Sequence, residues 1–260
     1  FETARWAKEQ GLNLVIYDPL TWYWKQIPEI IGEADFYVAQ NFLGVEKRLQ
    51  DESTLFPDYA IVPPIISGIH DKTAEHNQQT LLVNMGGLSN PYMSLQDLEH
   101  FAKTTFSVIY NTLDPLYDVT NYLSSKSIVE TVQEICPAKT LQPQEVQDCL
   151  SASNLAIMTS GLGNIYEASS MSKKVIWLPP ANDSQGQQIS LLRQHKMADY
   201  SIDWSDIFID EEPIDYFSSQ EVVMSKIATY MKRLSNEPKA KARFTVLLCV
   251  NYEEAQSKKS

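Results

Sequence analysis

The sequence predicts an α/β protein with two doubly wound parallel-sheet domains, of which the N-terminal one is incomplete. Short apolar runs recur along the 260 residues, and most of them end in glycine or proline. Segments with helical spacing of apolar residues follow many of these runs. Because strands that alternate with helices form parallel sheets covered on both faces, we expect ligands to bind at the carboxyl ends of the strands.

Residues 1–75 are predicted to be the remaining part of an N-terminal, acceptor-side domain. A helix over 1–10 precedes the buried parallel strand LNLVIYDPL, and the strands ADFYVAQNF and YAIVPPIIS follow with the polar helix VEKRLQDES between them. The chain opens within a helix and not at a methionine, so we expect a further segment upstream of Phe1. The polar stretch 67–80 is the expected linker, with the boundary near His76.

Residues 76–235 are predicted to form the second domain, and residues 236–260 a solvated, lysine-rich tail. Strands are expected at QTLLVNMGG, SVIYNTL (107–113), around KTLQ (139–142), NLAIMTSG and KVIWLPP. Helices are expected over 94–106, 143–153, 161–171, 187–200 and 218–235. This repeated order of strand, turn and helix predicts a single doubly wound sheet.

Composition narrows the class of protein further. The formal net charge of −12 disfavours nucleic acid and anionic membrane surfaces, because an acidic field repels phosphate. No apolar run reaches the roughly 18 residues of a membrane-spanning helix. Three cysteines without metal-type spacing are typical of free thiols in a reducing compartment. We therefore expect a soluble, cytoplasmic protein, for which a homodimer is possible.

The segment 157–192 carries the most informative polar residues. In chain order these are Ser160-Gly161, Gly163-Asn164, Glu167, Pro179, Asp183 and Gln187-Gln188. Small residues where a strand turns into a helix let backbone N–H groups approach a diphosphate, and the helix N-terminus favours its negative charge. A carboxylate about two turns into the same helix can accept hydrogen bonds from two ribose hydroxyls. Taken singly, the serine could be a helix cap and the glutamate a solvated residue.

This segment resembles the donor-site signature of GT-B glycosyltransferases, above all the bacterial enzymes that form lipid II and related antibiotic glycosyltransferases. The resemblance implies two Rossmann-like domains and a hexosyltransferase activity. A sugar would pass from a nucleotide diphosphate to an acceptor hydroxyl without a metal. The resemblance also implies that Glu167 binds the ribose and that Asp183, Gln187 and Gln188 bind the donor sugar. For the two glutamines the alternative is an ordinary polar helix start.

Two further motifs fall where the family contacts the nucleotide. NMGGLSNPY matches the glycine-rich loop that the family has near the phosphates, and the alternative is an ordinary turn. Leu141-Gln142-Pro143 matches the loop where the family holds the base, and the alternative is an ordinary loop. The expected nucleotide and diphosphate contacts are Gly86, Gly87, Ser89, Leu141, Gln142, Ser160, Gly161, Leu162, Gly163, Asn164 and Glu167. A UDP-linked donor is the first expectation, although thymidine, guanosine and cytidine donors stay open.

The sequence assigns no catalytic base, no metal and no cofactor beyond the nucleotide sugar as co-substrate. The dinucleotide fingerprint and the P-loop are absent, and His70, His76, His100 and His195 have no carboxylate partner at recognisable spacing. The family's base comes from an early N-terminal loop. Aromatic residues 22–24 could line an acceptor groove but favour a core position. The resemblance implies a small-molecule or lipid-linked acceptor. The alternatives are a nucleotide-sugar 2-epimerase, a hydrolase, or a non-catalytic binding module that needs a partner.

Overall fold

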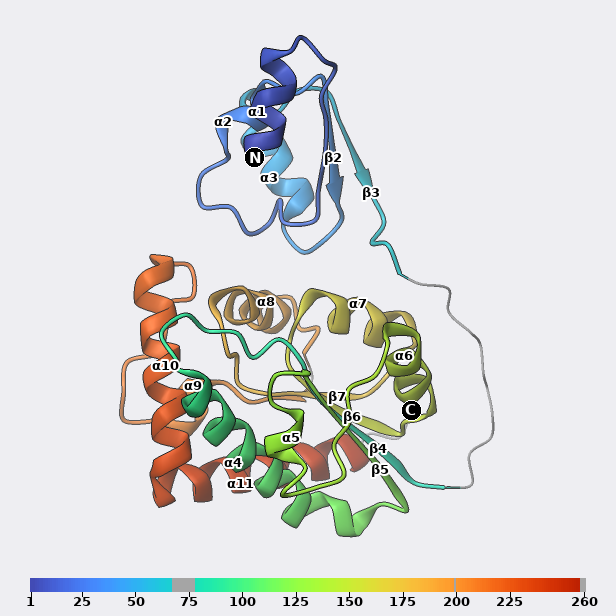
Figure 1. Cartoon of the computed structure of the whole chain (residues 1–260), viewed down its shortest axis with the longest axis vertical. Coiled ribbons are helices and arrows are strands. Elements are labelled where there is room, and N and C mark those ends of the chain that lie inside the picture. The colour runs from blue at the N-terminus through green and yellow to red at the C-terminus, as the bar shows by residue number, and fades with distance from the viewer. Residues whose placement is uncertain (67–77, 199, 258–260) are drawn as a thin grey trace. The chain divides into compact units, whose positions relative to one another are not determined.

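The computed structural model describes residues 1–66, 78–198 and 200–257, and the chain divides into two compact units, 1–65 and 66–260. Each unit contains one parallel sheet (Figure 1). The predicted boundary near His76 lies outside the described residues, as does most of the predicted linker.

The first unit contains a three-stranded sheet in the order β1-β2-β3. Its elements are α1 (Glu2–Glu9), β1 (Val15–Asp18), α2 (Glu29–Gly32), β2 (Phe36–Gln40), α3 (Val45–Asp51), a 3-10 turn (Ser53–Leu55) and β3 (Tyr59–Val62). All pairs are parallel, with Val15 opposite Phe36 and Tyr37 opposite Tyr59. Each predicted strand therefore forms, although it is shorter than its apolar run.

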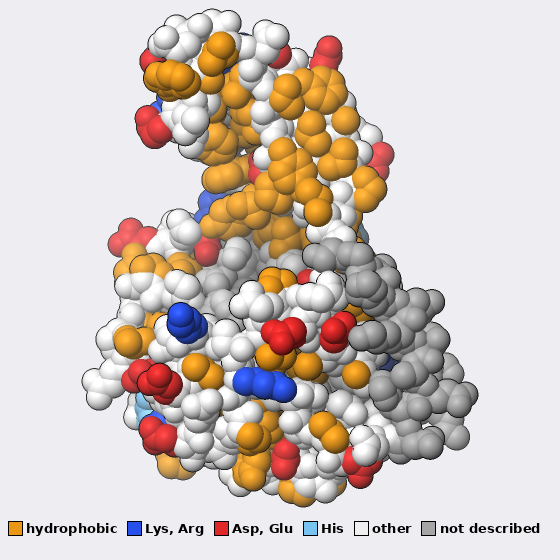
Figure 2. Space-filling view, turned by 45° about the vertical axis from the view of Figure 1, so that its right-hand side comes forward, with side chains coloured by type: hydrophobic (Ala, Val, Ile, Leu, Met, Phe, Trp, Pro, Cys, Tyr) orange, Lys and Arg blue, Asp and Glu red, His pale blue; other side chains and the backbone are white. Residues whose placement is uncertain are grey.

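The two faces of this sheet differ in burial. Tyr37 and Ala39 are fully buried on the face that α2 and α3 cover, as right-handed crossovers between successive neighbours require. Val15, Tyr17 and Phe36 point to the other face and are 62%, 43% and 36% exposed. Hydrophobic side chains are accordingly prominent on this unit in Figure 2. The prediction of a buried parallel strand therefore holds for β1 on one face only, where Ile16 and Asp18 are buried.

The turn after β1 is held by a buried carboxylate. Asp18 accepts hydrogen bonds from the Tyr37 hydroxyl at 2.6 Å and from the Trp24 indole at 2.7 Å. Burial, reinforced by the hydrogen bond to Asp18, raises the pKa of Tyr37 far above its usual value. Trp22 is buried and its ring lies 5.1 Å from that of Phe42. This part of the aromatic run is therefore core, as the sequence favours.

The second unit contains a five-stranded parallel sheet in the order β5-β4-β6-β7-β8. Its strands are β4 (Thr80–Met85), β5 (Val119–Ser124), β6 (Leu155–Met158), β7 (Val175–Trp177) and β8 (Tyr200–Ser201). Its helices are α4 (Leu95–Leu113), a 3-10 turn (Asp114–Leu116), α5 (Val129–Val132), α6 (Pro143–Ala152), α7 (Leu162–Ser170), α8 (Asp183–Gln194), α9 (Trp204–Ile207), α10 (Gln220–Asn236) and α11 (Pro238–Ser257).

Helices cover both faces of this sheet, with α6, α7 and α8 on one side and α4, α5 and α11 on the other (Figure 1). The chain leaves β4 for β5 in one direction and later returns to β6 on the other side of β4. The switch point of the doubly wound sheet is therefore between β4 and β6, and ligands of such sheets bind at the carboxyl ends of the strands there.

Two strand predictions in this unit are wrong. Residues 107–113 belong to α4, because Phe106, Ile109 and Leu113 continue the buried face of a single 19-residue helix. The edge strand next to β4 is instead β5, which was not predicted from the sequence; its first residue, Val119, is exposed and the next two are half-buried. The strand expected around residues 139–142 is reduced to one bridge, between Lys139 and Leu123.

The predicted tail is also wrong, because most of residues 236–260 forms helix α11. Ala240, Phe244, Leu248 and Ala255 are buried in the core of the second unit. The helix was missed because its apolar residues form a narrow stripe, at spacings of four and seven residues, among the lysines and the arginine near the start of the segment. Although α4 and α11 are long, the described part of the chain holds no helix apolar enough to cross a bilayer.

Candidate functional site

The loops after β4 and β6 are tied together at the switch point. The Thr159 hydroxyl donates to the carbonyl of Gly86 at 2.7 Å, and the Thr159 backbone N–H donates to the carbonyl of Asn84 at 3.2 Å. The Asn164 side chain returns to donate to the Thr159 carbonyl at 2.8 Å. The glycine-rich turn and the start of α7, which the sequence assigns to one diphosphate site, are therefore neighbours.

The N-terminus of α7 is open and carries no negative charge. Gly161 is its N-cap, no side chain caps it, and its first turn contains no acidic residue. A methyl group placed on Gly161 or Gly163 would have no atom within 4 Å other than those of its chain neighbours and its own helix backbone. The N–H groups of residues 162–164 have no acceptor within the helix, and the helix dipole adds a partial positive charge there. This end of α7 can therefore receive an anion.

Ser160 has a different place from the one that its motif suggests. Its side chain is fully buried, and the hydroxyl donates to the carbonyl of Gln185 at 3.1 Å. The serine thus joins the β6 loop to helix α8. A diphosphate contact by Ser160 would have to come from its backbone.

Glu167 lies one turn beyond Gly163 on the same face of α7. Helical side chains lean toward the N-terminus of their helix, so its carboxylate is directed over the turn that the glycine leaves open. Glu167 Oε1 accepts a hydrogen bond of 3.1 Å from Gln147 Nε2 of α6. Helix α6 begins at Pro143, directly after the predicted base loop of Leu141 and Gln142. Glu167 therefore lies between the predicted diphosphate and base positions.

The glycine-rich turn is held against α8 by amide side chains. Gly87 has a left-handed backbone with φ of 74°, which favours glycine. Its carbonyl accepts hydrogen bonds from Asn182 at 3.2 Å and Gln185 at 3.1 Å. Gln185 also accepts from the Ala181 N–H at 2.9 Å. Gly87 and Ser89 are exposed and Gly86 is half-buried, so the turn reaches the surface.

The residues predicted at the donor sugar lie inside helix α8. Asp183, Gln187 and Gln188 are 5%, 2% and 3% exposed. Gln188 Oε1 is buried and finds no hydrogen-bond partner among the described residues. Their role at the sugar stays a prediction.

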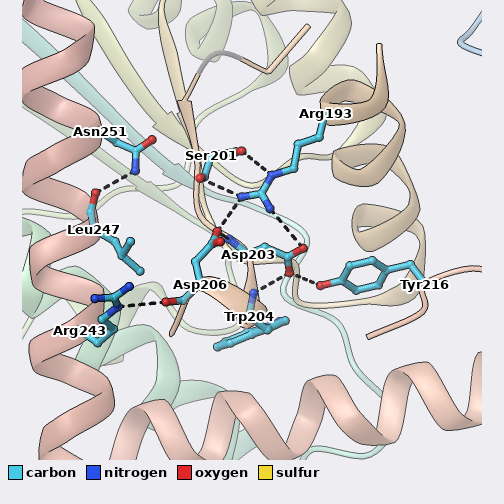
Figure 3. Close-up of polar contacts among 9 residues, drawn as sticks. All are labelled: Arg193, Ser201, Asp203, Trp204, Asp206, Tyr216, Arg243, Leu247 and Asn251. Atoms are coloured by element: carbon cyan, nitrogen blue, oxygen red, sulfur yellow. Dashed lines mark hydrogen bonds and ion pairs between the residues drawn. The ribbon is translucent and has the colours of Figure 1, made fainter. Parts of the chain in front are cut away.

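A second polar network fixes the other end of α8 (Figure 3). Arg193 donates to the Ser201 hydroxyl and to Asp206, both at 2.7 Å, and its guanidinium lies 3.6 Å from Asp203. Asp203 accepts a hydrogen bond from the Tyr216 hydroxyl, and burial raises the pKa of its carboxyl. The Tyr216 ring packs on Gly186, where an added methyl group would lie 2.1 Å from it. The sequence did not single out this network.

Several contributors to the candidate site carried no recognisable sequence signal. Four of them were missed in the sequence analysis, because each forms its hydrogen bond with a residue of a distant segment: Thr159, Asn182, Gln185 and Gln147. His100 and His195 are exposed, whereas His70 and His76 lie outside the described residues. Within the described ranges, His, Cys, Asp and Glu side chains form no group of three that could hold a metal ion.

We compared the sequence and the structure with those of known proteins. No protein-family model matches the sequence, and no curated protein sequence matches it significantly. Arabidopsis thaliana UGT89C1 complexed with UDP is similar at a TM-score of 0.52 and 12% identity, over 97% of this chain and 64% of that one. UGT89C1 in a second crystal structure gives 0.51 with the same identity and coverage. A UDP-glucosyltransferase from Polygonum tinctorium gives 0.49 and 11% identity, over 98% and 68%.

The fold is that of GT-B proteins, with Rossmann-like parallel sheets in both units. The chain spans about two thirds of the length of these proteins, at 64% to 68%. The structures that resemble it are UDP-glycosyltransferases, which agrees with the coarse prediction from the sequence. The narrower resemblance to the enzymes that form lipid II stays a prediction.

Proposed function

We propose that this chain binds the diphosphate of a UDP-linked sugar at the start of α7 and takes part in transfer of the sugar to an acceptor hydroxyl without a metal. The observation that carries this proposal is the open N-terminus of α7 at the switch point, with Glu167 one turn further along the same face. Neutral glycines and free N–H groups suit a diphosphate, and a carboxylate suits two ribose hydroxyls.

The proposed chemistry follows from where charge develops. The bond between the anomeric carbon of the sugar and the β-phosphate oxygen breaks, and the acceptor oxygen forms the new bond while it loses its proton to a base. The departing diphosphate gains negative charge. N–H groups already oriented at the helix start stabilise that charge without reorganisation, which is the usual source of such catalysis.

The proposal predicts that a Gly163→Leu variant folds normally and binds UDP much more weakly than wild type. The Cβ atom of the new side chain would have no atom within 4 Å other than those of its chain neighbours and its own helix backbone, and leucine favours a helix more than glycine does. It would exclude the phosphates and remove two or more charge-assisted hydrogen bonds, so affinity should fall at least about 100-fold. Isothermal titration calorimetry with UDP and thermal denaturation measure the two effects.

Ser169→Leu is the matched control, because Ser169 is exposed on the same helix and has no role in the proposed site. It should retain the wild-type affinity. Undiminished UDP binding by Gly163→Leu would remove the diphosphate assignment. Incubation with UDP-glucose alone tests the reaction type, since turnover without an acceptor would favour an epimerase or a hydrolase over a transferase.

A further inference from the structure

The contact between Gln147 and Glu167 joins the two helices that flank the proposed ribose position. Gln147 is on α6 and is 3% exposed, whereas Glu167 is half-buried on α7. Gln147 Nε2 donates to Glu167 Oε1 at 3.1 Å across 20 residues of sequence. No other hydrogen bond to the Glu167 side chain is recorded in the described part of the chain, so this amide alone orients the carboxylate.

The rest of the Gln147 side chain is poorly satisfied. Its carbonyl Oε1 is buried and has no hydrogen-bond partner among the described residues. A buried acceptor without a donor lowers stability, and an apolar side chain of similar size would avoid that loss. Packing between α6 and α7 therefore does not require a glutamine. What the glutamine supplies is its N–H group, and that group meets the carboxylate.

From this we infer that Gln147 is a positioning residue for Glu167, which it holds in the conformation that accepts the two ribose hydroxyls; the inference rests on the proposed nucleotide site. A glutamate side chain has three rotatable bonds, and a hydrogen bond at one oxygen restricts them before the ligand arrives. Binding then loses less side-chain entropy. The second carboxylate oxygen keeps its full capacity to accept hydrogen bonds from the ribose.

A purely structural role for Gln147 makes the opposite prediction about stability. If the Gln147 and Glu167 pair served to hold α6 against α7, loss of the amide would destabilise the protein. If Gln147 positions Glu167 for a ligand, its replacement by leucine removes an unsatisfied acceptor, and stability should stay the same or rise while nucleotide affinity falls. Stability and affinity moving in opposite directions therefore separates the two roles.

The test compares wild type, Gln147→Leu, Glu167→Ala and the double variant by calorimetry with UDP and with 2′,3′-dideoxy-UDP. Gln147→Leu should bind UDP about tenfold more weakly, which is what added ordering of one long side chain costs. Its affinity for the dideoxy nucleotide should be unchanged, because the hydroxyls that Glu167 binds are missing. The double variant should bind UDP no more weakly than Glu167→Ala.

Gln144→Leu is the matched control, because Gln144 is exposed on the same helix and contacts Asp148 instead of Glu167. If Gln147→Leu does not fold, Gln147→Met replaces it in the same comparison. An unchanged UDP affinity in Gln147→Leu, or an equal loss for UDP and the dideoxy nucleotide, overturns the positioning role while Glu167→Ala still reports on the site. Absence of UDP binding in the wild type overturns both proposals.

Discussion

Replacement of Glu167 by alanine should lower the affinity for UDP by a factor of about 10² to 10⁴. The carboxylate is expected to accept two hydrogen bonds from the ribose, and a hydrogen bond to a charged group contributes about 1.5–3 kcal/mol. The protein should remain folded, because Glu167 is half-buried and, among the described residues, only Gln147 donates a hydrogen bond to its side chain. Isothermal titration calorimetry with UDP measures the change directly.

Two further variants make this result specific. Glu253→Ala removes an exposed carboxylate of α11 that makes no hydrogen bond or ion pair with the described residues, and it should leave UDP affinity unchanged. Glu167→Gln keeps the size of the side chain but only one acceptor oxygen, so its affinity should lie between those of wild type and alanine. Equal UDP affinity of wild type and Glu167→Ala would contradict the assignment of Glu167 to the ribose. It would not by itself contradict the diphosphate site at α7.

The largest expected loss of stability comes from Trp204→Ala, about 3–5 kcal/mol in the free energy of unfolding. Trp204 is fully buried, and its ring lies 6.0 to 6.3 Å from those of Phe101, Phe208 and Tyr230. Its indole N–H donates to the carbonyl of Pro180 at 2.8 Å. Removal of the ring leaves a cavity and an unpaired carbonyl. Urea denaturation followed by circular dichroism measures the loss.

Trp204→Phe separates the two contributions. Phenylalanine keeps much of the apolar volume but cannot donate to Pro180, so we expect a smaller loss of about 1–3 kcal/mol. Trp6→Ala is the matched control, since Trp6 is 56% exposed on α1 and should change the stability little. If Trp204→Ala were as stable as wild type, the core of the second unit would not depend on this ring.

The parts of the fold that the sequence predicted best are those specified by local pattern. The buried strands β4 and β6 are mostly apolar, and a glycine follows each within three residues, a signal that requires no knowledge of distant residues. The open start of α7 is also local, because small residues at 161 and 163 leave room by having no side chain. Strand, turn and helix could be placed in order for the same reason.

The errors arose where distant contacts decide the structure. Residues 107–113 have strand-forming residues, yet their packing against other elements extends α4 through them. The basic start of α11 suggests a tail, and only burial of Phe244 in the core shows that the helix belongs to the domain. Propensity is a weak signal that tertiary contacts override.

By itself the sequence determined the class of fold and the segment that carries the candidate site, because hydrophobic period and turn residues act over a few neighbouring positions. The tertiary structure alone decided which polar groups meet. Thr159 contacts Gly86 across 73 residues, Gln185 contacts Gly87 across 98, and Gln147 contacts Glu167 across 20. These contacts exist only once the parallel sheet brings the ends of its strands together, so no short stretch of sequence can specify them.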